Sequence, residues 1–201
     1  MRPPKIIEKG EVRLVPLSEL DLPTPSSTPE ASLHRETVKQ RVVEMAWRGY
    51  ILAGEDEVRR PTLHGHPSID AYDESAPLSF TPANLRHGVL LARDIGGDSG
   101  DPPTTRMTRI YDVPRTAFVV LHENDYLTGR ALVTMARESV NSTVRDWPAS
   151  LQVLFAPSGN CRGSLMWWTP RMLYFLQTWT EGFTPESASK LIADYALKIT
   201  R

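Results

Sequence analysis

Apolar residues recur at helical spacing in three stretches, each of which begins just after a Thr-Pro pair. Threonine is a good N-cap residue, and proline suits the first helical position because its missing N–H would have no partner there. Apolar residues three or four positions apart indicate an amphipathic helix. We therefore predict an N-terminal helix over about 29–53 and two C-terminal helices over about 170–181 and 185–199, of which the last has the most regular pattern.

The part of the chain between these helices consists of short apolar runs separated by turn-forming residues. Runs rich in valine, leucine and aromatic residues predict strands, and short connections are typical of antiparallel neighbours. The predicted strands cover residues 109–113, 116–122, 130–137, 150–156 and 161–168. For residues 130–144 the alternative prediction to a strand is a partly helical structure. The pattern predicts an α+β fold with an antiparallel meander of about four or five strands, roughly 109–168, flanked by helices.

The N-terminal residues differ in composition from the rest of the chain. Residues 10–17 alternate between apolar and polar side chains, which predicts one short edge strand. Residues 22–29 are rich in proline, as in an extended linker. We expect residues 1–28 to form a Pro-rich extended arm, and 29–201 to form a single α+β domain with an irregular acidic section over about 54–101.

Composition narrows the class of protein only coarsely. Apolar residues make up 40% of the chain and charged residues 23%, which is the balance of an ordinary globular protein. The net charge of −1 gives no general attraction to nucleic acid or to a membrane surface. Cys161 is the single cysteine, which excludes a disulfide within the chain. With neither a signal-peptide pattern nor a membrane span in the sequence, we expect a protein that is cytoplasmic or within a particle, and not secreted.

A His-x-His segment is the candidate metal site. His64 and His66 on an extended segment can aim two imidazoles at one ion, and Asp70 can complete the ligand set. The alternative is a solvated loop with two surface histidines. A second acidic segment follows at 94–101, and spacing alone does not say whether it lies near the histidines. We predict no cofactor.

Cys161 is a candidate nucleophile if His122 or His87 lies beside it as a base. A neighbouring arginine, Arg162, can favour the thiolate. The alternative is a small residue at the start of a strand. Because no further motif surrounds the cysteine, we assign no catalytic residue.

Arginines gather near the start of the predicted meander. Arg106, Arg109 and Arg115 form a basic cluster that can contact phosphate or a partner's acidic groups. Such a cluster makes nucleic acid a possible partner. The preferred alternative is a set of surface ion pairs with the acidic section over 54–101.

Two features indicate contact with other proteins. Trp167 and Trp168 are adjacent in a predicted strand, so they point to opposite faces and only one can belong to the same core layer. The other must be covered by a helix of the same chain, by the arm, or by another protein, and tryptophan is enriched at interface hot spots. Pro23 and Pro25 lie in the arm and can dock as an extended Pro-rich segment.

These patterns favour a structural or interaction protein, which assembles with copies of itself or with other chains, as a virion component does. The mechanism would be arm exchange or strand addition together with burial of Trp167 or Trp168, so deletion of 1–28 is expected to abolish assembly and leave the fold intact. One alternative is a metal-dependent hydrolase that uses the His-x-His loop. A second alternative is a nucleic-acid-binding module that uses the arginines, whose binding would weaken steeply with salt.

Overall fold

The computed structural model describes residues 10–19, 29–62, 78–85, 88–96, 104–114 and 116–199, with their side chains except those of 29–35, 38 and 96. The strands of the main sheet are β2 (Ile51–Leu52), β3 (Val89–Gly96), β4 (Arg106–Val113), β5 (Ala117–Asp125), β7 (Ser142–Val144), β8 (Trp147–Phe155), β9 (Cys161–Trp168) and β10 (Met172–Thr180). A separate ribbon consists of β1 (Glu11–Val15) and β6 (Leu132–Ala136). The helices are α1 (Pro29–Arg48), α2 (Glu55–Val58) and α3 (Pro185–Ile199).

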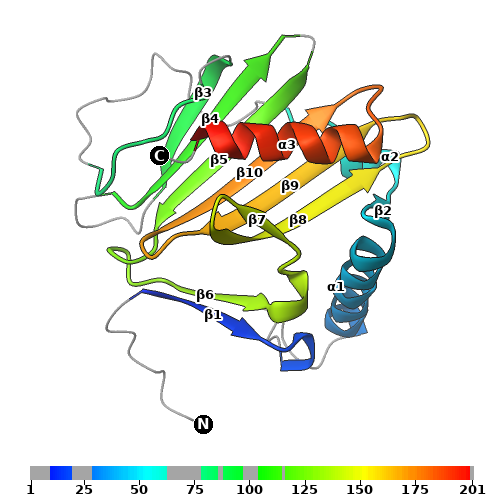
Figure 1. Ribbon diagram of the computed structural model, residues 1–201, viewed down its shortest axis with the longest axis horizontal. Helices are drawn as coiled ribbons and strands as arrows, with labels where there is room; N and C mark the ends of the chain where they lie inside the picture. Colours follow the sequence, from blue (N-terminus) through cyan, green and yellow to red (C-terminus); the bar gives the residue numbers. More distant parts are fainter. Residues whose placement is uncertain are drawn as a thin grey trace.

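Within the described residues, the main sheet has eight strands in the order β2-β8-β9-β10-β5-β4-β3, and β7 also pairs with β8 (Figure 1). The pairs along this order are antiparallel except β2 with β8, which is parallel. The predicted α+β class is confirmed in its coarse form: a largely antiparallel meander, one N-terminal helix and one C-terminal helix over the predicted range 185–199.

The predicted helix over 170–181 is wrong, because Met172–Thr180 forms β10 in the middle of the sheet. This strand pairs with β9 on one side and with β5 on the other. Its apolar side chains therefore lie on both faces, and such a run also fits a helical period. The preceding Thr169 caps a hairpin turn instead of a helix: its hydroxyl oxygen accepts a hydrogen bond from the Met172 N–H (3.0 Å), and its own N–H donates to the Met172 carbonyl (2.9 Å).

Two further differences concern the extent of the sheet. The predicted strand over 130–137 exists as β6, but it leaves the meander and pairs with β1 in parallel. The section over 54–101 that we expected to be irregular contains α2 and the eight-residue strand β3. The first difference reflects a pairing between segments far apart in the chain, which local patterns do not report. β3 instead pairs with the next strand in the chain, β4, as an antiparallel neighbour.

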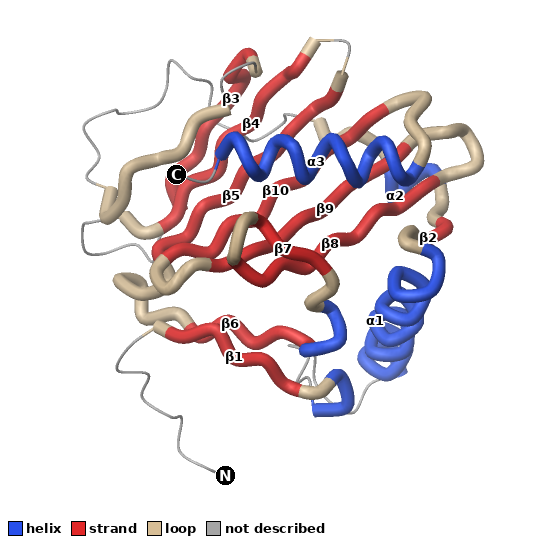
Figure 2. The backbone as a smooth tube through the Cα atoms, viewed as in Figure 1, coloured by secondary structure: helices blue, strands red, loops and turns tan. Residues whose placement is uncertain are grey.

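Helix α3 lies across one face of the sheet and closes the main core (Figure 2). The helix begins as the Thr184-Pro185 pair predicts, since the Thr184 hydroxyl accepts a hydrogen bond from the Ser187 N–H (3.2 Å). Its apolar stripe packs on side chains from several neighbouring strands. The buried members of this core on α3 are Ile192, Tyr195, Ala196 and Ile199, and those on the central strands include Val119, Leu121, Leu165, Trp167 and Leu176.

The opposite face of the sheet is covered at one corner by α2 and the end of α1. Met45, Ile51 and Val58 pack there on Leu154 of β8. A second apolar cluster on this face joins Ala92, Ile110, Phe118 and Val120, with Trp179 packed against it. The two faces of the sheet therefore have different environments, one under a long amphipathic helix and one with polar and aromatic side chains that are partly exposed.

A buried carboxylate joins three turns at one end of the sheet. The Asp125 side chain is 0% exposed and accepts hydrogen bonds from Arg171 Nε (3.0 Å) and Nη2 (2.7 Å) and from the Thr128 N–H (3.0 Å) and hydroxyl (2.8 Å). The Arg171 guanidinium also donates to the Ser79 carbonyl. This carboxylate thus holds the β5–β6 turn, the β9–β10 turn and the segment at Ser79 together.

The contact of α3 with the sheet at Gly163 gives a first prediction. A Cβ at Gly163 would lie 2.8 Å from Thr178 Oγ1 and 3.3 Å from Ile192 Cδ1. We expect Gly163→Ala to lower the free energy of unfolding by about 1–3 kcal/mol, because overpacking displaces these neighbours. Thr178→Ala in the same chain removes the nearest atom and should recover part of the loss. Urea unfolding of the single and double variants measures this, and strict additivity of the two losses would contradict the contact.

The Asp125 network gives a prediction that depends on pH. Burial raises the pKa of Asp125, but the hydrogen bonds from Arg171 and Thr128 outweigh burial, so the net pKa lies below the usual value. The network therefore stabilises the fold above the unfolded-state pKa of about 3.9, and this contribution is lost as the pH falls through the folded-state pKa. We expect Arg171→Met to lower the unfolding free energy at pH 7 by about 1.5–3 kcal/mol, and by less near pH 2.

Denaturant unfolding across this pH range measures the difference between the two chains. Arg106→Met is a matched control, because Arg106 is an exposed arginine on β4. It should change stability by about 0.5 kcal/mol or less at both pH values. A loss for Arg171→Met that is the same at both ends of the range would show that the charge on Asp125 is not involved.

Candidate functional site

The candidate metal ligands His64, His66 and Asp70 lie outside the described residues, as do His87, Pro23, Pro25 and Arg115. Asp94 lies on β3, whereas residues 97–101 of the acidic segment are again outside. Among the residues that the structure describes, no group of three or more His, Cys, Asp or Glu side chains could hold a metal ion. The metal-site hypothesis therefore stays a prediction from the sequence.

The two described arginines of the basic cluster point to opposite faces of β4. Arg106 is exposed, whereas Arg109 is 7% exposed and forms an ion pair with Glu123, which is 1% exposed. The Glu123 carboxylate also accepts a hydrogen bond from the Ala83 N–H (2.9 Å). The Arg109 side chain therefore forms a buried ion pair beneath the segment at Ala83, and it is not available to a partner at the surface.

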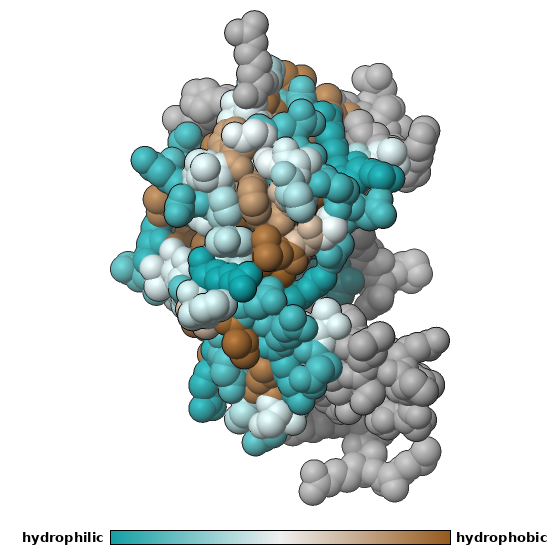
Figure 3. Space-filling view, turned by 90° about the vertical axis from the view of Figure 1, so that its right-hand side faces the viewer, coloured by the Kyte–Doolittle hydropathy of each residue, from teal (hydrophilic) through white to brown (hydrophobic). Residues whose placement is uncertain are grey.

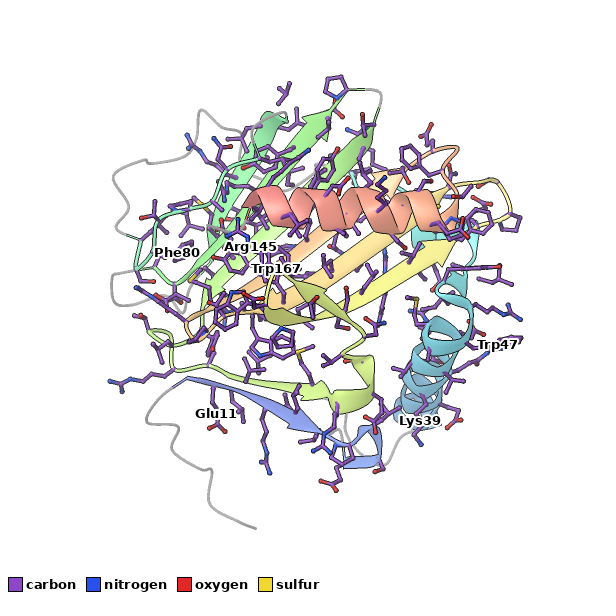
Figure 4. The ribbon with its side chains drawn as sticks, viewed as in Figure 1. Glu11, Lys39, Trp47, Phe80, Arg145 and Trp167 are labelled. Carbon is purple, nitrogen blue, oxygen red and sulfur yellow. The ribbon has the colours of Figure 1, made fainter. Side chains whose placement is uncertain are left out.

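Trp167 and Trp168 also lie on opposite faces, as expected for neighbours in a strand. Trp167 is 0% exposed and stacks on Tyr174 with 4.9 Å between ring centroids, in the core that α3 covers (Figure 4). Trp168 is partly exposed on the other face, paired across strands with Leu173. Trp167 is thus the core member of the pair, and a role of Trp168 at an interface stays a prediction.

Cys161 and His122 are kept apart by the sheet. The Cys161 thiol faces α3, is 0% exposed and donates a hydrogen bond to the Phe183 carbonyl (3.3 Å). Burial raises the pKa of this thiol, although a hydrogen bond with Thr180 acts in the opposite direction. His122 lies on the other face, where its Nδ1 is 2.8 Å from Thr108 Oγ1. Burial therefore disfavours the thiolate of Cys161, and His122, the one candidate base among the described residues, is not its neighbour.

A cavity of about 530 Å³ opens where α2 meets the ends of the central strands. Its apolar floor is Phe118 and Trp179, whose rings meet edge to face with 5.7 Å between centroids. Arg60 stacks over Phe118 at 4.2 Å and lies 3.7 Å from Asp112. The described residues that line it are Val58, Arg59, Arg60, Asp112, Val113, Thr116, Ala117, Phe118, Asn160, Trp179, Thr180 and Glu181. This volume is within the range of small-molecule sites.

The chemistry of this cavity is that of a contact surface with no preferred charge. Among the described lining residues two side chains are basic and two are acidic, so these residues favour neither an anion nor a cation. Arg59 is paired with Asp56 at 2.7 Å, and the Thr116 hydroxyl donates to the Pro114 carbonyl (3.3 Å). Sequence patterns could not indicate this site, because its walls come from segments that only the sheet topology brings together.

The outer face of α1 carries the most exposed large apolar side chains that the structure describes. Trp47 is 76% exposed and Val43 is 64% exposed, one helical turn apart. Trp47 points away from the sheet in Figure 4, and the Arg48 guanidinium lies 4.8 Å from its ring centroid. Figure 3 faces this side of the molecule and shows apolar side chains between hydrophilic ones. We call Val43 and Trp47 the outer stripe of α1.

The described side chains of α1, those of residues 36, 37 and 39–48, contribute little to the core of their own chain. The helix has 20 residues, and Met45 is the only buried residue among the α1 side chains that are described. The apolar pattern of residues 29–53 places Trp47 on the apolar face of the predicted helix, but the structure leaves this side chain in solvent.

Comparisons of the chain with protein-family models, with curated proteins and with solved structures give no match. No helix within the described residues is long and apolar enough to cross a membrane. The surfaces and contacts described above therefore have to carry the functional argument alone.

The buried Arg109–Glu123 pair gives a prediction that separates its structural role from a surface role. We expect Arg109→Met to lower the unfolding free energy by about 3–5 kcal/mol, because it breaks a buried ion pair by removing one of the two charged partners. Adding Glu123→Gln removes the other charge and keeps an acceptor for the Ala83 N–H, so the double variant should be more stable than the single one. Chemical denaturation tests this; a double variant less stable than Arg109→Met would contradict the buried-pair account.

Proposed function

We propose that the protein is an assembly subunit, which packs against other protein chains through the outer stripe of α1. The observation that carries this proposal is the 76% exposure of Trp47 on α1, where Met45 is the one buried side chain among those that the structure describes. Tryptophan is over-represented among the residues that contribute most of the binding energy at protein–protein interfaces.

The surroundings of the stripe support a protein partner. Leu52, on the edge strand just after the helix, adds a third apolar side chain with 54% exposure. Charged and polar residues border the stripe, including the Glu36–Lys39 pair (3.8 Å between charged atoms) and the Gln40–Glu44 hydrogen bond (3.2 Å). An apolar centre with a polar rim is the usual anatomy of a protein interface.

Neither alternative gains support from a described residue. A metal-dependent hydrolase would rest on His64, His66 and Asp70 alone. A nucleic-acid-binding module loses Arg109 to the interior pair with Glu123. An interaction protein is the class for which the described residues supply a specific surface.

Replacing the stripe tests the proposal. We expect light scattering on a size-exclusion peak to give a mass above one chain for the unmodified protein. Val43→Gln combined with Trp47→Gln should weaken association at least tenfold, because losing one interface hot spot costs about 2 kcal/mol or more. Glutamine is a good helix former, so α1 itself should persist, which circular dichroism can verify.

Leu197→Gln is the matched control, since Leu197 is an apolar residue on α3 with 47% exposure. It should leave the mass unchanged. Repeating the measurement with a chelator separates assembly from metal binding. A mass of one chain at every concentration, or a loss of assembly with the Leu197 control as well, would overturn the role of the α1 stripe.

A further inference from the structure

The β1–β6 ribbon stands apart from the main sheet (Figure 1). Within the described part of the chain, β6 pairs with β1 alone, in parallel, from Glu11 opposite Leu132 to Val15 opposite Ala136. Backbone bonds continue the ladder at one end, where the Glu11 N–H donates to the Ala131 carbonyl (3.1 Å). At the other end the Leu17 N–H donates to Glu138 Oε2 (2.8 Å).

The place that β1 occupies is shaped for this segment. Gly10 is buried directly against the turn before β6, and a Cβ at Gly10 would lie 1.8 Å from the Tyr126 carbonyl oxygen. A glycine is therefore required at this point, because the backbone approaches more closely than a side chain allows. Beyond it, Val15 is buried at 7% exposure. The site thus selects an extended segment that begins with glycine and ends with an apolar residue.

The ribbon is incomplete by the usual rules for sheets. A two-stranded unit is only marginally stable by itself, and parallel strands are normally covered on both faces. Here one face of the ribbon is open to solvent, with Glu11 and Arg13 on β1 and Leu132 and Thr134 on β6 all exposed. A weakly held terminal strand of this kind can leave and return without disturbing the main core.

We infer that β1 is exchanged between copies of the chain, so that Gly10–Val15 of one copy pairs with β6 of another copy in the register described above. The inference rests on the proposed function in that copies must associate, but it uses a different contact from the α1 stripe. The segment between Glu19 and Pro29 has the composition of an extended spacer.

A second copy is the partner that the contacts favour. The site on β6 already fits this strand in register, with a buried glycine and an apolar end, and the same hydrogen bonds form whether the strand comes from the same chain or from another. Copies held together through α1 would raise the local concentration of the neighbouring β1, which shifts the balance toward exchange. Exchange of an identical element is a common route to oligomers.

Cysteine pairs across the ribbon test this inference in the full chain. In a Cys161→Ala background, Arg13→Cys is placed in one preparation and Thr134→Cys in another, because these exposed residues are opposite each other in the register. The two preparations are mixed and oxidised, and disulfide-linked dimers are measured by mass. We expect at least ten times more 13–134 dimer than in a control mixture in which Leu197→Cys replaces Thr134→Cys.

A chain that carries both Arg13→Cys and Thr134→Cys shows whether a disulfide can form between these two positions. If the 13–134 pair does not close in it, the exposed pair Glu11→Cys and Leu132→Cys takes its place. Disulfides that form only within the doubly substituted chain, in a sample whose scattering mass exceeds one chain, would overturn exchange and leave assembly through α1 standing. A mass of one chain with no interchain disulfide would overturn both. Gly10→Val should abolish the interchain bond, because its side chain collides with the Tyr126 carbonyl, and persistence of that bond would also overturn exchange.

Discussion

The architecture depends on β10 pairing on both of its edges. Met172–Thr180 hydrogen-bonds to β9 on one side and to β5 on the other, so it joins the β8–β9 hairpin to the β3–β4–β5 meander. Each of these halves would otherwise end in an open edge. The continuous surface that results is wide enough for α3 to lie across it, and the Asp125–Arg171 contact then fixes the turns at one end.

The elements that the sequence predicted well are those whose stability is local. Helix α3 has a regular apolar stripe and a Thr-Pro start, and the strands of the meander alternate with short turns. The sequence of β10 also fits a helix, because apolar side chains on both faces of this strand remove the alternation of apolar and polar residues that marks a strand. The pairing of β1 with β6 could not be predicted, because the two strands are more than a hundred residues apart and the sequence of neither strand identifies its partner.

Residues that are close in sequence and were grouped into candidate sites lie on opposite faces of the sheet. Arg106 and Arg109 are three positions apart, which places them on opposite faces of β4, and Trp167 and Trp168 are separated in the same way. Cys161 and His122 likewise lie on different sides. For α1 the periodicity correctly indicated a helix, but periodicity cannot say which side of a helix is covered by its own domain, and Trp47 is on an exposed side.

The buried position of Cys161 allows local opening at the start of α3 to be measured through the reactivity of its thiol. The thiol is sealed beneath the start of α3 and hydrogen-bonded to the Phe183 carbonyl, so a thiol reagent can reach it only when that end of the helix lifts. The rate of modification, divided by the rate for an unhindered thiol, is then a direct reading of how often the lifted state is visited. Because the chain has no other cysteine, that reading comes from a single known place without any added label.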